Sequence, residues 1–331
     1  MAKNRHESLG LTDEQAVDMY RHMLLARRLD ERMWLLNRAG KIPFVISCQG
    51  QEASQIGASF AFDRTKDYVL PYYRDLGIVL AFGMTPKELM LSAFAKADDP
   101  NSGGRQMPSH FGQKENRIVT QSSPVTTQVP HAVGIALAAK MDDETFASFV
   151  TLGEGSTNQG DFHEGLNFAG VHKLPVITMV ENNQYAISVP LDKQYASENI
   201  SARAASYGMP GVTVNGNDPL AVYDEVKKAR EQAVNGEGPT LIETLSYRFT
   251  AHSSDDDDSQ YRESSEVEEA KKNDALISYA AYLKESGAMS DETEQKISTE
   301  IDSIVNEATD YAEKADYPEP ASAHKYVYEE V

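Results

Sequence analysis

The segment GEGSTNQGDFHEG, residues 153–165, combines closely spaced glycines with an acidic residue between the first two. Glycine-rich turns after a strand can bind phosphate through their backbone N–H groups. A P-loop is excluded, because that motif requires Lys after its last glycine and none follows these glycines. A dinucleotide fingerprint is not excluded by spacing, since Gly153, Gly155 and Gly160 follow a predicted strand and Glu181 ends the next one.

A second polar segment, ENNQYAIS at residues 181–188, follows the next predicted strand. Parallel strands end at the same edge of a sheet, so Glu154 and Asn183 could face one cavity. Carboxylate and amide oxygens are hard ligands that suit Mg²⁺, which usually takes its other ligands from water or a bound phosphate. The acid between the glycines is therefore expected to bind a metal that binds phosphates. The simpler alternative is a turn with a solvated, exposed Glu and an Asn-rich loop.

These loops need a sheet to position them, and the sequence predicts one. A buried strand is expected at residues 145–152, and further strands at 175–181, 211–214 and 239–247. Between them, one helix carries Phe162, Leu166 and Ala169, and another starts at the N-cap Asp218 and runs to about Val234. Strands that alternate with helices predict an α/β fold, a parallel sheet flanked by helices on both faces.

Helical extensions are expected at both ends of the chain. Thr12 and Gln15 have the spacing of a capping box, so a helix begins there. After residue 262 the pattern is helical, and one apolar stripe comprises Ile297, Ile301, Ile304, Ala308 and Tyr311. The predicted organisation is an N-terminal helical arm at 1–44, an α/β domain at 45–262 and a C-terminal helical segment at 263–331.

Composition limits the possible partners and location. The chain has 331 residues and a net charge of −20, which argues against a nucleic-acid surface. No apolar run approaches the roughly 20 residues that span a membrane. The single cysteine, Cys48, excludes an internal disulfide framework. The N-terminus lacks the features of a signal or transit peptide, so a cytoplasmic location is expected.

Four further segments carry a family resemblance. They are LPYYRDLG at 70–77, GGRQMPSHFG at 103–112, SSPVTTQVPHAVG at 122–134 and YRFTAHSSDDDDSQYR at 247–262. With the G-acid-G and Asn-pair motif, which resembles that of thiamine diphosphate enzymes, they resemble the alpha subunit of the decarboxylating component of 2-oxo acid dehydrogenase complexes. The resemblance extends from about residue 10 to 328, and GRQMPSHFG is closer to branched-chain members than to pyruvate members.

The resemblance implies a thiamin diphosphate-binding fold of the diphosphate type in residues 45–262, with Mg²⁺ and thiamine diphosphate as cofactors. Glu154, Asn183 and the Tyr185 carbonyl match the metal ligands. The other matching positions are Tyr73 and Arg74 at the cofactor and its diphosphate, Ser123 and Val125 under the thiamine rings, Gly153, Gly155 and Ser156 in a diphosphate seat at a helix N-terminus, and His252 on a mobile active-site loop. Glu181 stands where some branched-chain relatives carry Arg, so that diphosphate contact is not carried over.

The resemblance also implies a reaction and partners. A branched-chain 2-oxo acid would be decarboxylated, and its acyl group would pass to a lipoyl group on the acyltransferase component. His252, Tyr73 and Ser123 are the candidate catalytic residues, with His252 managing the proton of the transfer. Thiamine diphosphate enzymes of this type use two α/β domains, and this chain has room for one. A beta subunit is therefore expected, in an assembly of two alpha and two beta chains.

Alternatives remain at this point. A pyruvate or acetoin dehydrogenase alpha subunit has the same motifs, an NAD-dependent oxidoreductase would use the same glycines without Mg²⁺, and a non-catalytic scaffold subunit would need no such site. Arg74 could simply pair with Asp75, and His252 could be an ordinary loop histidine. The run Asp255 to Asp258 is most simply a solvated loop. The remaining histidines considered are structural or helix-surface residues: His110, His131, His163 and His172.

Overall fold

A five-stranded, wholly parallel sheet forms the centre of the computed structural model, which describes residues 4–327. Its order is β1-β2-β3-β7-β6. The strands are β1 Tyr68–Leu70, β2 Ser148–Gly153, β3 Val176–Asn182, β6 Gly211–Asn215 and β7 Thr240–Leu245. The four predicted strands are confirmed and β1 was missed. In β2 and β3, which are neighbours, Gly153 lies opposite Glu181, so the two polar loops leave the sheet side by side.

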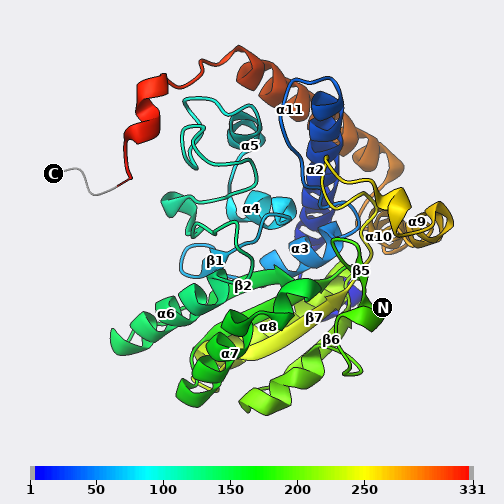
Figure 1. The fold of residues 1–331 in the computed structure, drawn as a ribbon. Helices are drawn as coiled ribbons and strands as arrows, with labels where there is room; N and C mark the ends of the chain where they lie inside the picture. The colour runs from blue at the N-terminus through cyan, green and yellow to red at the C-terminus, as the bar shows by residue number, and fades with distance from the viewer. Residues whose placement is uncertain (1–3, 328–331) are drawn as a thin grey trace.

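Helices cover both faces of the sheet, as predicted (Figure 1). Their bounds are α1 Arg5–Ser8, α2 Asp13–Arg38, α3 Glu52–Ser59, α4 Leu76–Phe82, α5 Pro86–Ala93, α6 Gln128–Met141, α7 Gly160–His172, α8 Pro219–Val234, α9 Ser264–Lys271, α10 Ala275–Glu285 and α11 Asp291–Lys314. A short antiparallel pair, β4 Tyr185–Ala186 and β5 Val189–Pro190, follows β3. The predicted N-cap of α8 is confirmed, since Asp218 accepts from the backbone N–H groups of Leu220 and Ala221.

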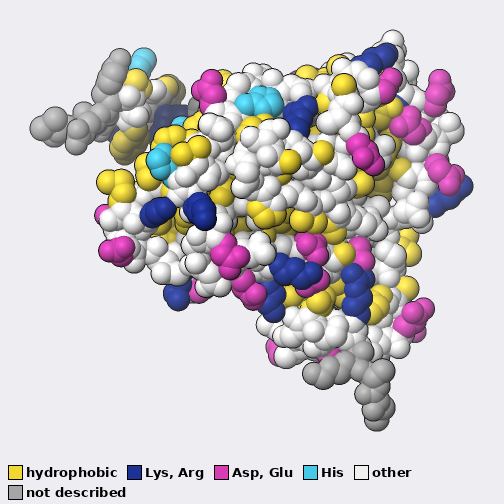
Figure 2. Space-filling model, turned by 90° about the horizontal axis from the view of Figure 1, so that it is seen from below, with side chains coloured by type: hydrophobic (Ala, Val, Ile, Leu, Met, Phe, Trp, Pro, Cys, Tyr) yellow, Lys and Arg dark blue, Asp and Glu magenta, His cyan; other side chains and the backbone are white. Residues whose placement is uncertain are grey.

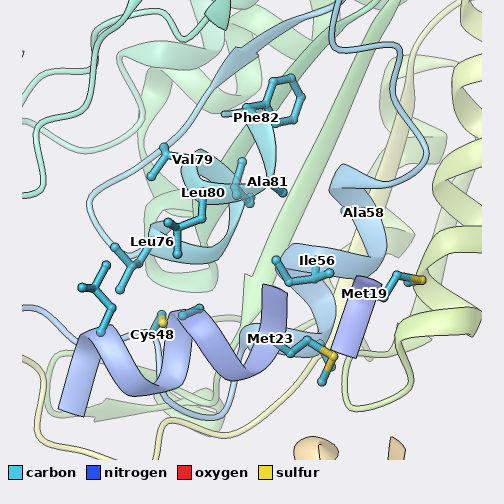
Figure 3. Close-up of a cluster of buried hydrophobic side chains, with 14 of the residues drawn as sticks. Met19, Met23, Cys48, Ile56, Ala58, Leu76, Val79, Leu80, Ala81 and Phe82 are labelled. Atoms are coloured by element: carbon cyan, nitrogen blue, oxygen red, sulfur yellow. The ribbon is translucent and has the colours of Figure 1, made fainter. Parts of the chain in front are cut away.

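Alternate residues of the strands supply two separate cores. Phe149 and Ile177 point into a cluster with α2, α3, α4 and α8, whereas their neighbours Val150 and Val176 point into a cluster with α6 and α7. This follows from the two-residue period of a strand, and it explains why apolar residues stand next to one another in β2 and β3. Figure 3 shows part of the first cluster, where Met19 and Met23 of α2 lie near Ile56 of α3, and Leu76 and Leu80 of α4 form the adjoining part.

The terminal helices pack on this framework. The predicted capping box of α2 is confirmed: Gln15 N–H donates to the Thr12 hydroxyl at 3.2 Å, and Thr12 N–H donates to the Gln15 side chain at 2.9 Å. Helix α11 crosses α2 and α5 (Figure 1). Two members of its predicted stripe are wrong: Ile304 is half-buried while Val305 is buried beside it, and Tyr311 is 42% exposed and lies under the Lys87 ammonium. The helical period places Ala312 inward instead.

The described residues contain no helix with both the length and the apolar character needed to cross a bilayer.

Candidate active site

A cavity of about 380 Å³ lies where β2 and β3 end. Every residue that the sequence predicted for the site lines this cavity. They are Tyr73, Arg74, Ser123, Val125, Gly153, Glu154, Gly155, Ser156, Asn183, Tyr185 and His252. Three further residues complete the lining and were not predicted: Tyr72, Ala186 and Ile187. Segments far apart in the sequence thus meet at the carboxyl edge of a parallel sheet, the usual position of ligand sites in such folds.

Glu154 is buried, which corrects the expectation of an exposed loop carboxylate. It is 1% exposed, and its two oxygens accept from the Gln194 side chain at 3.2 Å and the Asn183 N–H at 3.3 Å. Burial raises the pKa of this carboxyl. Within residues 4–327 it forms no salt bridge. A buried carboxylate without a cation is energetically costly, so a metal ion beside it would offset that cost.

Arg74 is the opposite charge on the same cavity. It is 2% exposed; its Nη1 donates to the Ser47 carbonyl at 2.6 Å, and its Nε is buried without an acceptor. The alternative pairing with Asp75 is wrong, since the Asp75 carboxyl accepts from Thr151 and from the Tyr72 N–H. Nη2 also donates to the His252 carbonyl at 3.3 Å, but within residues 4–327 Arg74 forms no salt bridge with a carboxylate, so its guanidinium charge is available to phosphate oxygens.

His252 lies against this guanidinium. Its Nδ1 is 3.3 Å from Arg74 Nη2, and its ring meets the Tyr73 ring edge-on with centroids 6.0 Å apart. Burial, with the charges of Arg74 and Arg248, lowers the pKa of His252 to about 4. The imidazole is therefore neutral near pH 7. Because Arg can only donate, Nδ1 accepts and the ring proton sits on Nε2.

The acidic run beside His252 is not simply solvated, as the sequence had suggested. Asp256 accepts from the His252 N–H at 2.8 Å and from the Tyr261 hydroxyl at 2.6 Å. Asp258 pairs with Arg262 at 2.6 Å. Two of the four acids thus hold the loop that carries His252, while Asp255 and Asp257 are exposed.

The glycine loop differs in one respect from the expected helix N-terminus. Residues Glu154–Asn158 form a 3₁₀ turn, and α7 begins only at Gly160. Gly155 is required there for space, because a Cβ at this position would lie 2.5 Å from the Cβ of Ala186. The first N–H groups of such a turn still have no acceptor within it, so Gly155 and Ser156 can donate to an anion.

Ser123 and Val125, which were expected to lie under the thiamine rings, line the cavity. Ser123 is exposed and its hydroxyl is 2.6 Å from His110 Nε2, while Val125 is half-buried. From the sequence, His110 was expected to be a structural or helix-surface residue, so its contact with Ser123 was not predicted. The sequence signal for a site role of His110 was its position in the GRQMPSHFG segment, which carries the family resemblance.

Two buried carboxyl groups lie beneath the cavity. Glu181 and Asp75 are both fully buried and interact with each other, and burial raises the pKa of both. Glu181 accepts from Gln55 at 3.0 Å and from Gln51. It therefore faces the protein interior and not the cavity, and Gln51 joins Tyr72 among residues that the sequence did not single out.

The donor set around Glu154 fits a hard metal held partly by a ligand. Residues 4–327 contain no group of three or more His, Cys, Asp or Glu placed to share an ion. What the cavity offers is one carboxylate, the Asn183 amide and the Tyr185 carbonyl region, with Arg74 available for an anion. An all-protein cage is thus absent from this part of the chain, and Mg²⁺ completing its shell with phosphate oxygens suits the set.

Comparison with known proteins agrees with this geometry. The family model described as "Dehydrogenase E1 component" matches residues 20–321. The chain is 74% identical over 328 residues to the 2-oxoisovalerate dehydrogenase subunit alpha of Bacillus subtilis (strain 168), covering 99% of both chains. It is 39% identical over 330 residues to the mitochondrial 2-oxoisovalerate dehydrogenase subunit alpha of Mus musculus, covering 99% of this chain and 74% of the relative.

A relative with another name is more distant. The pyruvate dehydrogenase E1 component subunit alpha of Bacillus subtilis (strain 168) is 37% identical over 322 residues, covering 97% of this chain and 84% of the relative. The family match and the whole-chain identities lead to one conclusion: the chain belongs to the dehydrogenase E1 component family.

Proposed function

We propose that the chain is the alpha subunit of a 2-oxoisovalerate dehydrogenase, which binds Mg²⁺ and thiamine diphosphate and decarboxylates branched-chain 2-oxo acids. Membership of the family implies thiamine diphosphate, and Mg²⁺ is our addition. The observation that carries the proposal is a pair of buried, opposite charges on one cavity, Glu154 and Arg74, neither of which forms a salt bridge within residues 4–327. A metal–diphosphate pair would neutralise both at once.

The residues divide the binding between them. Glu154, the Asn183 amide oxygen and the Tyr185 carbonyl would hold Mg²⁺. Arg74 and the N–H groups of Gly155 and Ser156 would hold the diphosphate. Gly153 precedes this loop and lines the cavity without a side chain. Tyr73, Ser123 and Val125 would lie beside the organic rings of the cofactor. When bound, thiamine diphosphate supplies the electron sink that loss of carbon dioxide requires and that no side chain provides.

His252 would act in transfer of the acyl group. With its ring proton on Nε2 and Nδ1 accepting from Arg74, the neutral side chain presents one N–H donor at a fixed position, and it can take up a proton only when Nδ1 leaves Arg74. Tyr73 packs against the ring and limits its rotation. His252, with Tyr73 and Ser123, remains our candidate catalytic group.

The substrate class rests on the relatives. Identity to the Bacillus 2-oxoisovalerate dehydrogenase subunit is 74%, against 37% to the pyruvate subunit. This difference supports a branched-chain substrate and makes a pyruvate or acetoin enzyme the second candidate. The family match leaves no support for an NAD-dependent oxidoreductase.

A beta subunit would complete the site. Ile187 at the cavity rim is 56% exposed, Val189 is 39% exposed and Ser123 is exposed. Figure 2 shows apolar side chains exposed in patches on one face, between scattered charges. Exposed apolar area of this kind supports a partner surface. We propose two alpha and two beta chains acting on a lipoyl-bearing acyltransferase in the cytoplasm, with segments 1–44, 45–262 and 263–331 as the parts of this chain.

Reconstitution tests this proposal. The chain alone is expected to release no carbon dioxide from 2-oxoisovalerate, and adding the beta subunit with Mg²⁺, thiamine diphosphate and an artificial oxidant should start the reaction. We expect kcat/KM for 2-oxoisovalerate to exceed that for pyruvate by at least about 10-fold, the discrimination that added methyl groups give in an apolar pocket. Turnover by this chain alone contradicts the two-chain model, and a preference for pyruvate contradicts the substrate assignment.

A further inference from the structure

Gln51 connects the sheet to the candidate metal ligand. It is fully buried just before α3 and does not line the cavity. The Asn183 Nδ2 donates to Gln51 Oε1 at 2.8 Å. Gln51 Nε2 in turn donates to the Tyr72 hydroxyl at 3.2 Å and to Glu181 Oε2. One side chain thus joins Asn183 to Glu181 through both ends of its amide.

The chemistry of the hydrogen bonds fixes the direction of this chain. The oxygen and nitrogen of an Asn or Gln amide have nearly the same shape, so only their partners determine which end points where. Glu181 Oε2 accepts from Gln51, from Gln55 and from the Tyr72 hydroxyl. An oxygen with three donors must face the Nε2 end of Gln51. The Oε1 end therefore faces Asn183, and it requires Nδ2 of Asn183 on that side.

The consequence appears at the cavity. With Nδ2 committed to Gln51, Asn183 Oδ1 lies on the other side, where it accepts from the Tyr185 N–H at 3.3 Å. We propose that Gln51, oriented by Glu181, is a positioning residue that keeps the oxygen of Asn183 available to the metal. The inference rests on the proposed function, since it assumes that Asn183 is a Mg²⁺ ligand. It also gives Glu181 a role other than a diphosphate contact.

The backbone around Gln51 supports a fixed position. Gly50 has φ +93°, and a Cβ there would overlap the carbonyl oxygen of Tyr247. Gln51 N–H donates to the Cys48 carbonyl at 2.9 Å, and buried Asp30 accepts from the Cys48 N–H at 2.6 Å. A side chain on such a constrained turn loses little additional entropy when it orients Asn183.

Two variants with the same chemical change separate positioning from general packing. Gln51→Met removes both hydrogen-bonding ends and nearly keeps the volume. Gln55→Met is the matched control, because Gln55 is equally buried and also donates to Glu181, while its other bonds go to the backbone of Arg74 and Gly77 and not to Asn183. Each is made in the complete assembly with the beta subunit. Thiamine diphosphate is titrated at several Mg²⁺ concentrations by calorimetry, and thermal unfolding is followed without cofactor.

Gln51→Met is expected to raise the Mg²⁺ concentration needed for half-maximal cofactor binding by about 10- to 100-fold, the usual effect of removing a partner of a metal ligand. Saturating Mg²⁺ should restore binding. Gln55→Met should lower the unfolding temperature without this shift. In an Asn183→Ala background, Gln51→Met should add little further loss, because the side chain that it orients is gone.

Glu181→Gln gives a second, isosteric variant should Gln51→Met not fold. It lets the residue at this position donate as well as accept, so the Gln51 amide loses its fixed direction and the Mg²⁺ requirement should rise. Equal Mg²⁺ requirements for wild type and either folded variant, or equal shifts for the Gln51 and Gln55 variants, would overturn the inference. Absence of Mg²⁺-dependent binding in the wild type would instead reject the proposed function, so the two failures are distinguishable.

Discussion

Replacing Glu154 by Ala is expected to abolish Mg²⁺-dependent binding of thiamine diphosphate. Removing an outer partner of a metal ligand typically costs about 10- to 100-fold in affinity, so loss of the only carboxylate ligand should cost more than about 100-fold. The apo fold should not weaken much, because an uncompensated carboxylate that is 1% exposed is itself unfavourable there. Calorimetric titration of the assembled enzyme, with and without Mg²⁺, measures the effect.

Glu243→Gln is a control for loss of a buried carboxylate outside the cavity. Glu243 is also fully buried, on β7, and accepts from Asn182 at 2.7 Å and from the Ile200 N–H at 2.9 Å, but it does not line the cavity. Its replacement should reduce thermal stability and leave the Mg²⁺ requirement unchanged. Cofactor affinity that is unaltered in Glu154→Ala would refute the metal assignment.

Replacing His252 by Ala is expected to separate two activities. Overall activity with the lipoyl acceptor should fall by about 10²- to 10⁴-fold, the usual effect of losing one general acid or base. Decarboxylation coupled to an artificial oxidant should fall far less, because that step does not need the proton that His252 manages. Since the low pKa of about 4 keeps His252 neutral, its loss removes no charge from the diphosphate site, and cofactor affinity should change little.

Both assays are run on one preparation, with cofactor binding checked by titration. His163→Ala provides the control, because this exposed histidine on α7 bonds to the Tyr207 hydroxyl and lies outside the cavity. It should leave both activities near wild type. Mild and equal losses in the two His252→Ala assays would make His252 an ordinary loop residue that the acidic run holds in place.

The sequence predicted the strands whose patterns are local. The strands β2, β3, β6 and β7 are apolar runs bounded by turn residues, and the N-cap of α8 has its own signal in Asp218 and Pro219. Strand β1 comprises only Tyr68–Leu70, too short for a periodic pattern. In α11 the apolar pattern did not show which of the adjacent residues Tyr311 and Ala312 is buried. Because the helical period is not a whole number of residues, Tyr311 points outward.

The sequence could predict which residues line the cavity, because strand ends and the motifs of the family resemblance identify segments that come together there. The burial and hydrogen bonding of these residues could not be predicted, because they depend on contacts between segments distant in sequence. Burial of Glu154 requires packing from Gln194, 40 residues away, and the orientation of Asn183 depends on Gln51, 132 residues away. The loop function of Asp256 likewise appears only when its carboxylate meets the His252 N–H.

Locating the metal directly tests the central claim. Crystals of the complete assembly would be grown with thiamine diphosphate and Mn²⁺, which accepts the same oxygen ligands as Mg²⁺, and anomalous diffraction would be recorded at the manganese edge. We expect one peak in this cavity, at about 2.1 Å from a Glu154 oxygen, Asn183 Oδ1 and the Tyr185 carbonyl oxygen, with Arg74 against the diphosphate. A metal bound to the cofactor elsewhere, or Asn183 presenting its nitrogen to the ion, would contradict it.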